Sequence, residues 1–221
     1  MCPGGSVSEL AGLRAALAAG EPRRLGQFGA APEGARRAAV LILLSDEPDP
    51  TVLLTERSAG LRAHAGQISF PGGGLDDGEH PVQGALREAT EEVGLDPRLV
   101  TPIGCLPPAW VPVSGYRVTP VVASWEEPVA LTPSDPAEVA GVLRPGLRHL
   151  ADPATRVTAT LPGGYRGPAF TSGEWFIWGL TAHLLDAVLR VGGWERPWPR
   201  DRHVPVPQRF LRDRVSDRAP R

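Results

Sequence analysis

The most informative part of the chain is GGLDDGEHPVQGALREATEEVGL, residues 73–95. Residues 81–93 are predicted to form a helix, because a proline opens the first turn and a glycine follows the last residue. The apolar residues of this helix recur at helical spacing and predict one buried face. Three glutamates, Glu88, Glu91 and Glu92, are spaced i, i+3 and i+4. They therefore share the opposite side of the helix.

These three glutamates repel one another. Each pair of carboxylates within about 6 Å loses roughly 3 kcal/mol at an effective dielectric of about 20. Arg87 can reach Glu91 one turn further on, but one arginine cannot neutralise three acids. A hard divalent cation can, and a set of oxygen ligands suits Mg²⁺ or Mn²⁺. The helix taken alone leaves a second interpretation open, which is a solvated acidic face.

The positions around the helix follow a known pattern. Gly73, five residues, Glu79, seven residues and then REATEEVGL resemble the Nudix box of the Nudix hydrolase superfamily at every fixed position. The resemblance implies a loop–helix–loop that holds metal against a diphosphate. It also implies an α/β (α+β) fold, the Nudix-type α/β/α sandwich with a mixed β-sheet, which agrees with the irregular alternation of strand and helix patterns along the chain.

The resemblance also implies catalytic roles for residues of this segment. Arg87 would orient the glutamates, and Glu79 would support the metal site. Bound Mg²⁺ or Mn²⁺ would neutralise the diphosphate and make a water molecule more acidic. Glu88, Glu92 and a downstream acid, Glu138, are candidates for the base, although Glu138 taken alone is better explained as an acid at a helix start. Four residues would hold the metal: Glu88, Glu92, Glu91 and the backbone carbonyl of Gly72.

The segment just upstream, LTERSAGLRAHAGQISFPGG at residues 54–73, narrows the substrate. It resembles the signature of the coenzyme A diphosphatases, L-T-x-R-S, three residues, R, three residues, G, three residues, F-P-G-G. Arginines suit a ligand that carries a diphosphate and a 3′-phosphate, because guanidinium groups form forked bonds to phosphate. Each residue taken singly can be an ordinary surface residue, but the spaced set favours a site. Five residues are candidates for binding the substrate: Arg57, Ser58, Arg62, His64 and Gln67.

The favoured function is metal-dependent hydrolysis of the diphosphate bond of coenzyme A, free, oxidised or acylated, to 3′,5′-ADP and 4′-phosphopantetheine. One alternative keeps the chemistry but changes the substrate to ADP-ribose, NADH or another nucleoside diphosphate derivative. Another is a nucleotide-sensing module that binds without cleaving. All acids of the box are present, which argues against an inactive site, and no helix-turn-helix pattern accompanies them.

Composition limits the partners and the compartment. The chain has 221 residues, a net charge of −2 and two cysteines. The near balance of charge argues against nucleic acid as a partner, and the two cysteines exclude a disulfide framework. The longest apolar run, residues 38–44, is far shorter than the ~18 residues of a membrane span. We therefore expect a cytoplasmic protein with a small-molecule substrate and no membrane partner, which can form a homodimer.

The chain divides into three expected parts. Residues 1–36 carry a short helix at 7–19 and a linker, residues 37–193 form the Nudix hydrolase domain, and residues 194–221 form an extended Pro/Arg-rich tail. Strands are expected at 38–44, 52–55, 67–70, 100–106 and 118–123, with the first two as a hairpin. A broken helix is expected at 138–150 and an amphipathic helix at 178–191.

Overall fold

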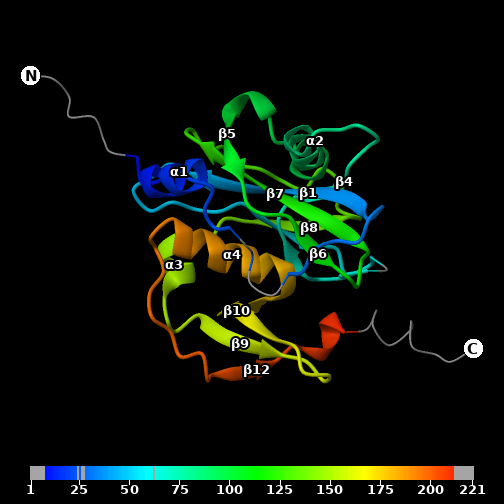
Figure 1. Cartoon of the computed structure of the whole chain (residues 1–221), viewed down its shortest axis with the longest axis vertical. Helices are drawn as coiled ribbons and strands as arrows, with labels where there is room; N and C mark the ends of the chain where they lie inside the picture. Colours follow the sequence, from blue (N-terminus) through cyan, green and yellow to red (C-terminus); the bar gives the residue numbers. More distant parts are fainter. Residues whose placement is uncertain (1–7, 24, 26–27, 62, 212–221) are drawn as a thin grey trace, which may run out of the picture.

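The computed structural model describes residues 8–23, 25, 28–61 and 63–211, and Figure 1 shows the arrangement of its elements. The main sheet is mixed, since β1 and β7 run parallel and the other neighbours pair antiparallel. Its strand order is β4-β1-β7-β5, and β6 also pairs with β7. The bounds are β4 (Gly72–Gly74), β1 (Arg36–Ser45), β7 (Tyr116–Trp125), β5 (Val100–Cys105) and β6 (Ala109–Val111).

Strand β1 shows why this sheet is buried on both faces. Leu41 and Leu43 enter one core, and the alternating residues Ile42 and Leu44 enter the other. All four side chains are at most 1% exposed. Successive side chains of a strand point to opposite faces, so a continuous apolar run needs cover on both sides.

Helices provide that cover. α2 (Pro81–Val93) packs on one face through Ala85, Ala89 and Val93. α1 (Ala11–Ala18) and α4 (Gly179–Val191) lie on the other face, as Figure 1 shows. This is the α/β/α sandwich that the sequence predicts.

Two smaller sheets complete the fold. One has the order β3-β2-β8, and the other the order β11-β10-β9-β12, which lies beyond α4 in the lower part of Figure 1. The bounds are β3 (Ile68–Ser69), β2 (Leu54–Arg57), β8 (Val139–Leu143), β11 (Trp175–Ile177), β10 (Arg166–Ser172), β9 (Arg156–Thr160) and β12 (His203–Pro205). The remaining short elements are α3 (Leu147–Ala151) and the 3-10 helices η1 (Pro97–Leu99) and η2 (Gln208–Phe210).

Two expectations about local structure are wrong. The segment 138–150 is not a broken helix but strand β8 followed by α3, because its first half pairs with β2. The expected hairpin is reduced to a bridge between Leu44 and Val52, and β2 pairs with β3 and β8 instead. In both places the pairing of β2 with β8, which lie more than 80 residues apart in the sequence, outweighs the local sequence pattern.

The C-terminal segment is also more ordered than an extended tail. β12 pairs in parallel with β9, and Val206 and Phe210 are 4% and 5% exposed. Proline interrupts the short apolar pattern here, so only the tertiary partner reveals the strand. Residues 212–221 lie outside the described part of the chain.

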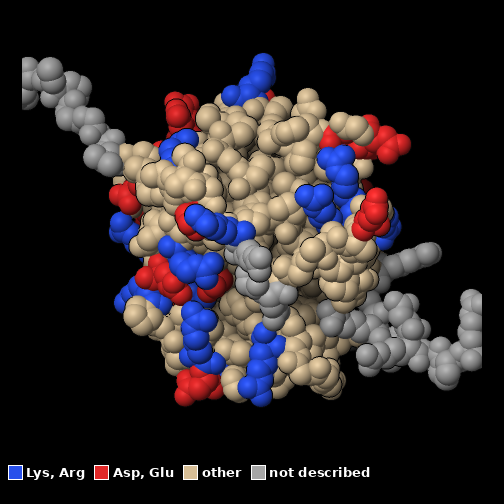
Figure 2. All heavy atoms as spheres, viewed as in Figure 1, with Lys and Arg blue, Asp and Glu red and all other residues tan. Residues whose placement is uncertain are grey.

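The surface seen in Figure 2 carries basic and acidic side chains interspersed among uncharged ones. None of the helices in the described ranges combines the length and apolar character needed to cross a bilayer.

Candidate active site

Local sequence fixes both ends of α2. At its start, the Nδ1 atom of His80 accepts a hydrogen bond from the Val82 N–H at 3.3 Å. At its end, Gly94 adopts the left-handed conformation, with φ 68° and ψ 25°, that a helix C-terminus favours. The bounds agree with the predicted 81–93. The acidic side of the helix therefore lies where the sequence placed it.

Arg87 links the acids of this segment to one another. Its Nε donates to Glu79 Oε1 at 2.9 Å, and its Nη1 donates to Glu88 Oε1 at 2.9 Å and to Glu91 Oε2 at 3.3 Å. Its Nη2 donates to the carbonyl oxygen of Gly74 at 3.1 Å. The hydrogen bond from Arg87 lowers the pKa of Glu79. One guanidinium thus fixes three carboxylates against the preceding loop.

Glu88 lies directly against the backbone of Gly73. A Cβ atom at Gly73 would stand only 2.5 Å from the carboxylate carbon of Glu88, so a larger residue would displace this group. Burial raises the pKa of Glu88, although the hydrogen bond from Arg87 acts in the opposite direction. The glycine therefore has a specific steric role beneath the acid.

Glu92 is the most buried acid of the site. The residue is 6% exposed, and its Oε2 atom has no hydrogen-bond partner in the described structure. Burial, followed by the charge of Glu138, raises its pKa to about 8, while the charge of Arg57 acts in the opposite direction. Glu88 contributes a further repulsion. A backbone hydrogen bond from Gly72 favours the charged form, but with one buried oxygen left without a partner this carboxylate ionises readily only beside a cation.

The donor atoms fit a hard divalent cation, since an unpartnered carboxylate oxygen of Glu92 lies near the carboxylate of Glu88. Glu91 differs from both, because its side chain is 60% exposed and pairs with Arg87. Within the described residues, no group of three His, Cys, Asp or Glu side chains forms a ready-made metal site. The described residues thus offer the carboxylates of Glu88 and Glu92 as the main donors to a cation.

Gly72 lies between the acids of α2 and the cavity that receives the predicted substrate-binding residues. Its φ is 151°, and a Cβ atom there would overlap the carbonyl oxygen of Ala39 and the backbone of Val40. Only glycine suits this backbone conformation and this close approach of two strands. Gly72 also lines the cavity next to β1.

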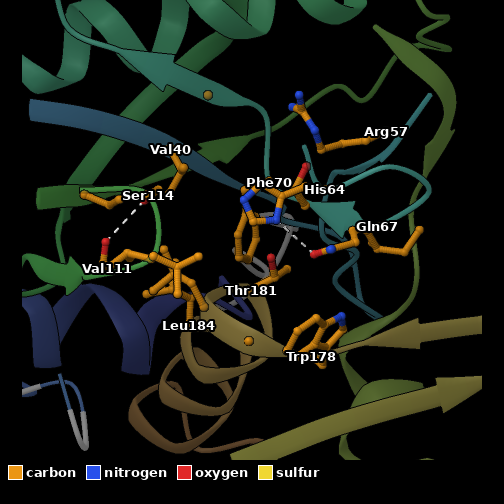
Figure 3. Close-up of a pocket in the computed structure, with 17 residues that line it drawn as sticks. Val40, Arg57, His64, Gln67, Phe70, Val111, Ser114, Trp178, Thr181 and Leu184 are labelled. Atoms are coloured by element: carbon orange, nitrogen blue, oxygen red, sulfur yellow. Dashed lines mark hydrogen bonds between the residues drawn. The ribbon is translucent and has the colours of Figure 1, made fainter. Parts of the chain in front are cut away.

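This cavity has a volume of about 250 Å³ and receives three of the five predicted substrate residues, Arg57, His64 and Gln67 (Figure 3). His64 Nδ1 and Gln67 Oε1 are 3.3 Å apart. Ser58 does not line the cavity, and its Oγ accepts a weak hydrogen bond from the Gly60 N–H at 3.4 Å. The prediction for Arg62 falls outside the described residues.

Much of the cavity wall was not identified from the sequence. Residues 178–181, at the start of α4, line it together with the turn between β6 and β7. These residues carry few chemical groups that signal a site, so the sequence predicted only an amphipathic helix here. Trp178 is 7% exposed and packs in a core cluster as well.

The comparisons with known proteins agree with this geometry. The model of the NUDIX domain matches residues 35–150. The chain belongs to the Nudix hydrolase family. It is 39% identical over 176 residues to the "Uncharacterized Nudix hydrolase NudL" of Cronobacter sakazakii, covering 73% of this chain and 85% of the relative. It is 40% identical over 162 residues to the NudL of an Escherichia coli strain, covering 71% and 83%.

Among solved structures, the Nudix hydrolase RenU of M. smegmatis matches with a TM-score of 0.46 and 28% identity, over 53% of this chain and 74% of that one. As a Nudix hydrolase, the protein acts on a diphosphate substrate, and such enzymes typically use divalent metals.

In this Nudix hydrolase Glu138 lies beside the acids of the box. It occupies a turn before β8, where its carbonyl oxygen accepts a hydrogen bond from the Ser58 N–H at 2.8 Å. Its charge raises the pKa of both Glu88 and Glu92. The alternative role as an acid at a helix start is wrong, because no helix begins there.

Proposed function

We propose that the protein hydrolyses the diphosphate bond of coenzyme A, in its free, oxidised or acylated form, to 3′,5′-ADP and 4′-phosphopantetheine. The observation that carries the proposal is the position of Arg57. This residue belongs to the segment that resembles the coenzyme A diphosphatases, it lines the cavity, and its charge acts on Glu92 of the Nudix box. We therefore assign the coenzyme A signature at residues 54–73 and the acids of the Nudix box to one site.

In this proposal Glu88 and Glu92 are the principal ligands of Mg²⁺ or Mn²⁺, with Glu91 and the carbonyl of Gly72 as further ligands. A bound cation supplies positive charge that neutralises the diphosphate oxygens and makes a nearby water molecule more acidic. Arg87 keeps Glu88 and Glu91 in place through its hydrogen bonds. Glu79 in turn fixes the Arg87 guanidinium.

A carboxylate then accepts the proton of the attacking water. Glu88, Glu92 and Glu138 are the candidates for this base. The charge of Glu138 raises the pKa of both Glu88 and Glu92, which makes either of these two a better proton acceptor. The exposed position of Glu138 gives it access to solvent, where the proton can leave the site.

Arg57 is suited to bind the substrate phosphates. Its Nε atom is buried and has no hydrogen-bond partner among the described residues. A phosphate oxygen would satisfy this donor and form a charge-assisted bond. His64 and Gln67 lie on the same side of the cavity and offer further polar atoms. Arg62 is proposed to meet the 3′-phosphate.

A comparison of substrates tests the proposal. Purified protein is given coenzyme A, dephospho-coenzyme A or ADP-ribose with Mg²⁺ or Mn²⁺, and the products are identified by mass spectrometry. We expect the highest kcat/KM for coenzyme A. Equal turnover of dephospho-coenzyme A and ADP-ribose would overturn the assignment, and binding of nucleotide without any cleavage would favour a sensing module.

Variants then locate the recognition of the 3′-phosphate. Arg62→Ala should raise the KM for coenzyme A more than the KM for dephospho-coenzyme A. Arg98→Ala is the control, since this side chain is 88% exposed and pairs with Asp96 just after α2. Equal losses on both substrates would assign Arg62 to another part of the ligand.

A further inference from the structure

The cavity beside the acids has two chemically different parts. Arg57, His64 and Gln67 supply polar groups on one side, as Figure 3 shows. The remaining wall is largely apolar and comes from β1, β6, β7, α4 and the segment between β3 and β4. Its main residues are Val40, Phe70, Val111, Val118, Leu180 and Leu184. We call this apolar part the chamber.

The chamber lies next to the place where the diphosphate would be held. Gly72 lines the cavity, and the following residue, Gly73, is in contact with the carboxylate of Glu88. Arg57 connects the cavity to Glu92 through its charge. One of the two groups attached to the diphosphate therefore enters the chamber, and the other extends toward solvent.

Charge decides which group enters. Among the described residues that line the cavity, Arg57 is the one arginine, and its charge acts on Glu92 of the Nudix box. A 3′-phosphorylated nucleoside would bring a further doubly charged phosphate to the apolar rim of the chamber, where it would lose hydration. The pantetheine arm is uncharged and rich in methyl and methylene groups, and its two amides need only a few polar partners.

Size and polar groups agree with this choice. A cavity of about 250 Å³ has room for a narrow flexible chain. The hydroxyl groups of Ser69, Ser114 and Thr181 also line the wall and can bond to the amides of the arm. We infer that the chamber binds the pantetheine arm of the substrate, which leaves the 3′-phospho-adenosine outside. This inference rests on the proposed function.

Filling the chamber tests the inference. Leu180 is half-buried in the first turn of α4, so Leu180→Trp places a larger side chain in the cavity without replacing a fully buried residue. Inhibition by 4′-phosphopantetheine should weaken at least about tenfold, and inhibition by 3′,5′-ADP should stay within about twofold. Calorimetric titration with each product gives the same comparison without relying on turnover.

Two variants serve as controls. Val191→Trp makes the same kind of change at the other end of α4, where the residue packs against the core and does not line the chamber. It should leave the binding of both products unchanged. Leu180→Met keeps the volume and the apolar character of the side chain and should retain the affinity of the wild type for 4′-phosphopantetheine.

The outcomes separate the inference from the proposed function. If Leu180→Trp weakens 3′,5′-ADP instead, or neither product, the assignment of the arm to the chamber is wrong even where coenzyme A is cleaved. A further outcome is that the wild type binds 4′-phosphopantetheine without cleaving coenzyme A, while Leu180→Trp loses that binding. In this case the chamber assignment stands and the proposed reaction is wrong.

Discussion

Replacing Glu92 by glutamine tests both the burial of its carboxylate and its part in holding a metal. Glutamine keeps the shape of the side chain and removes the charge. In the metal-free folded protein the pKa of Glu92 is about 8, against 4.5 for an ordinary glutamate, chiefly because of burial. Each pKa unit is worth about 1.4 kcal/mol, so ionised Glu92 lowers the free energy of unfolding by about 4 to 5 kcal/mol.

The sign of this effect depends on pH. Below about pH 4.5 the carboxyl is protonated in both the folded and the unfolded state, and the wild type and Glu92→Gln should have similar stability. As the pH rises, the unfolded state releases its proton first, so the wild type loses stability until the pH exceeds about 8. Without metal, Glu92→Gln should therefore be more stable than the wild type at alkaline pH.

Chemical denaturation from about pH 5 to pH 9, with and without Mg²⁺, measures this difference. Mg²⁺ should stabilise the wild type and have little effect on Glu92→Gln, whose hydrolysis rate should fall at least about 100-fold. Glu127→Gln is the control, since that residue is exposed and has no part in the proposed site. A stability difference that stays constant with pH would refute the burial argument. A near-normal rate for Glu92→Gln would place the metal site elsewhere.

Four further changes have defined outcomes. Arg87→Lys should lower kcat about tenfold or more, because lysine cannot span three carboxylates, and steady-state kinetics measures this. Gly73→Ala should reduce hydrolysis strongly, whereas Gly29→Ala, which meets no neighbour, should not. Phe210→Ala should lower the free energy of unfolding by about 3 kcal/mol or more, as measured with urea. Burial lowers the pKa of His183, so the free energy of unfolding should fall as the pH drops below about 6.5. In His183→Phe the free energy of unfolding, measured over the same pH range, should no longer show this fall.

The sequence by itself determined the central helix and the side on which its acids lie. Helix periodicity, the proline in the first turn and the terminal Gly94 act within a few residues of one another, so the predicted bounds of 81–93 agree with those of α2. The fixed spacing from Gly73 to Glu92 also identified the family. The burial alternation of β1 follows in the same way from its own apolar run.

Only the tertiary structure decided how these acids differ. Glu88, Glu91 and Glu92 are equivalent in the helical pattern, yet Glu92 is buried while Glu91 is exposed. Arg57 and Glu138, which lie 35 and 46 residues from Glu92 along the sequence, also come close enough for their charges to act on it. The chamber and strand β12 also depend on contacts between distant segments. Local patterns specify which face a side chain takes, but its burial and its charged neighbours depend on how the whole chain packs.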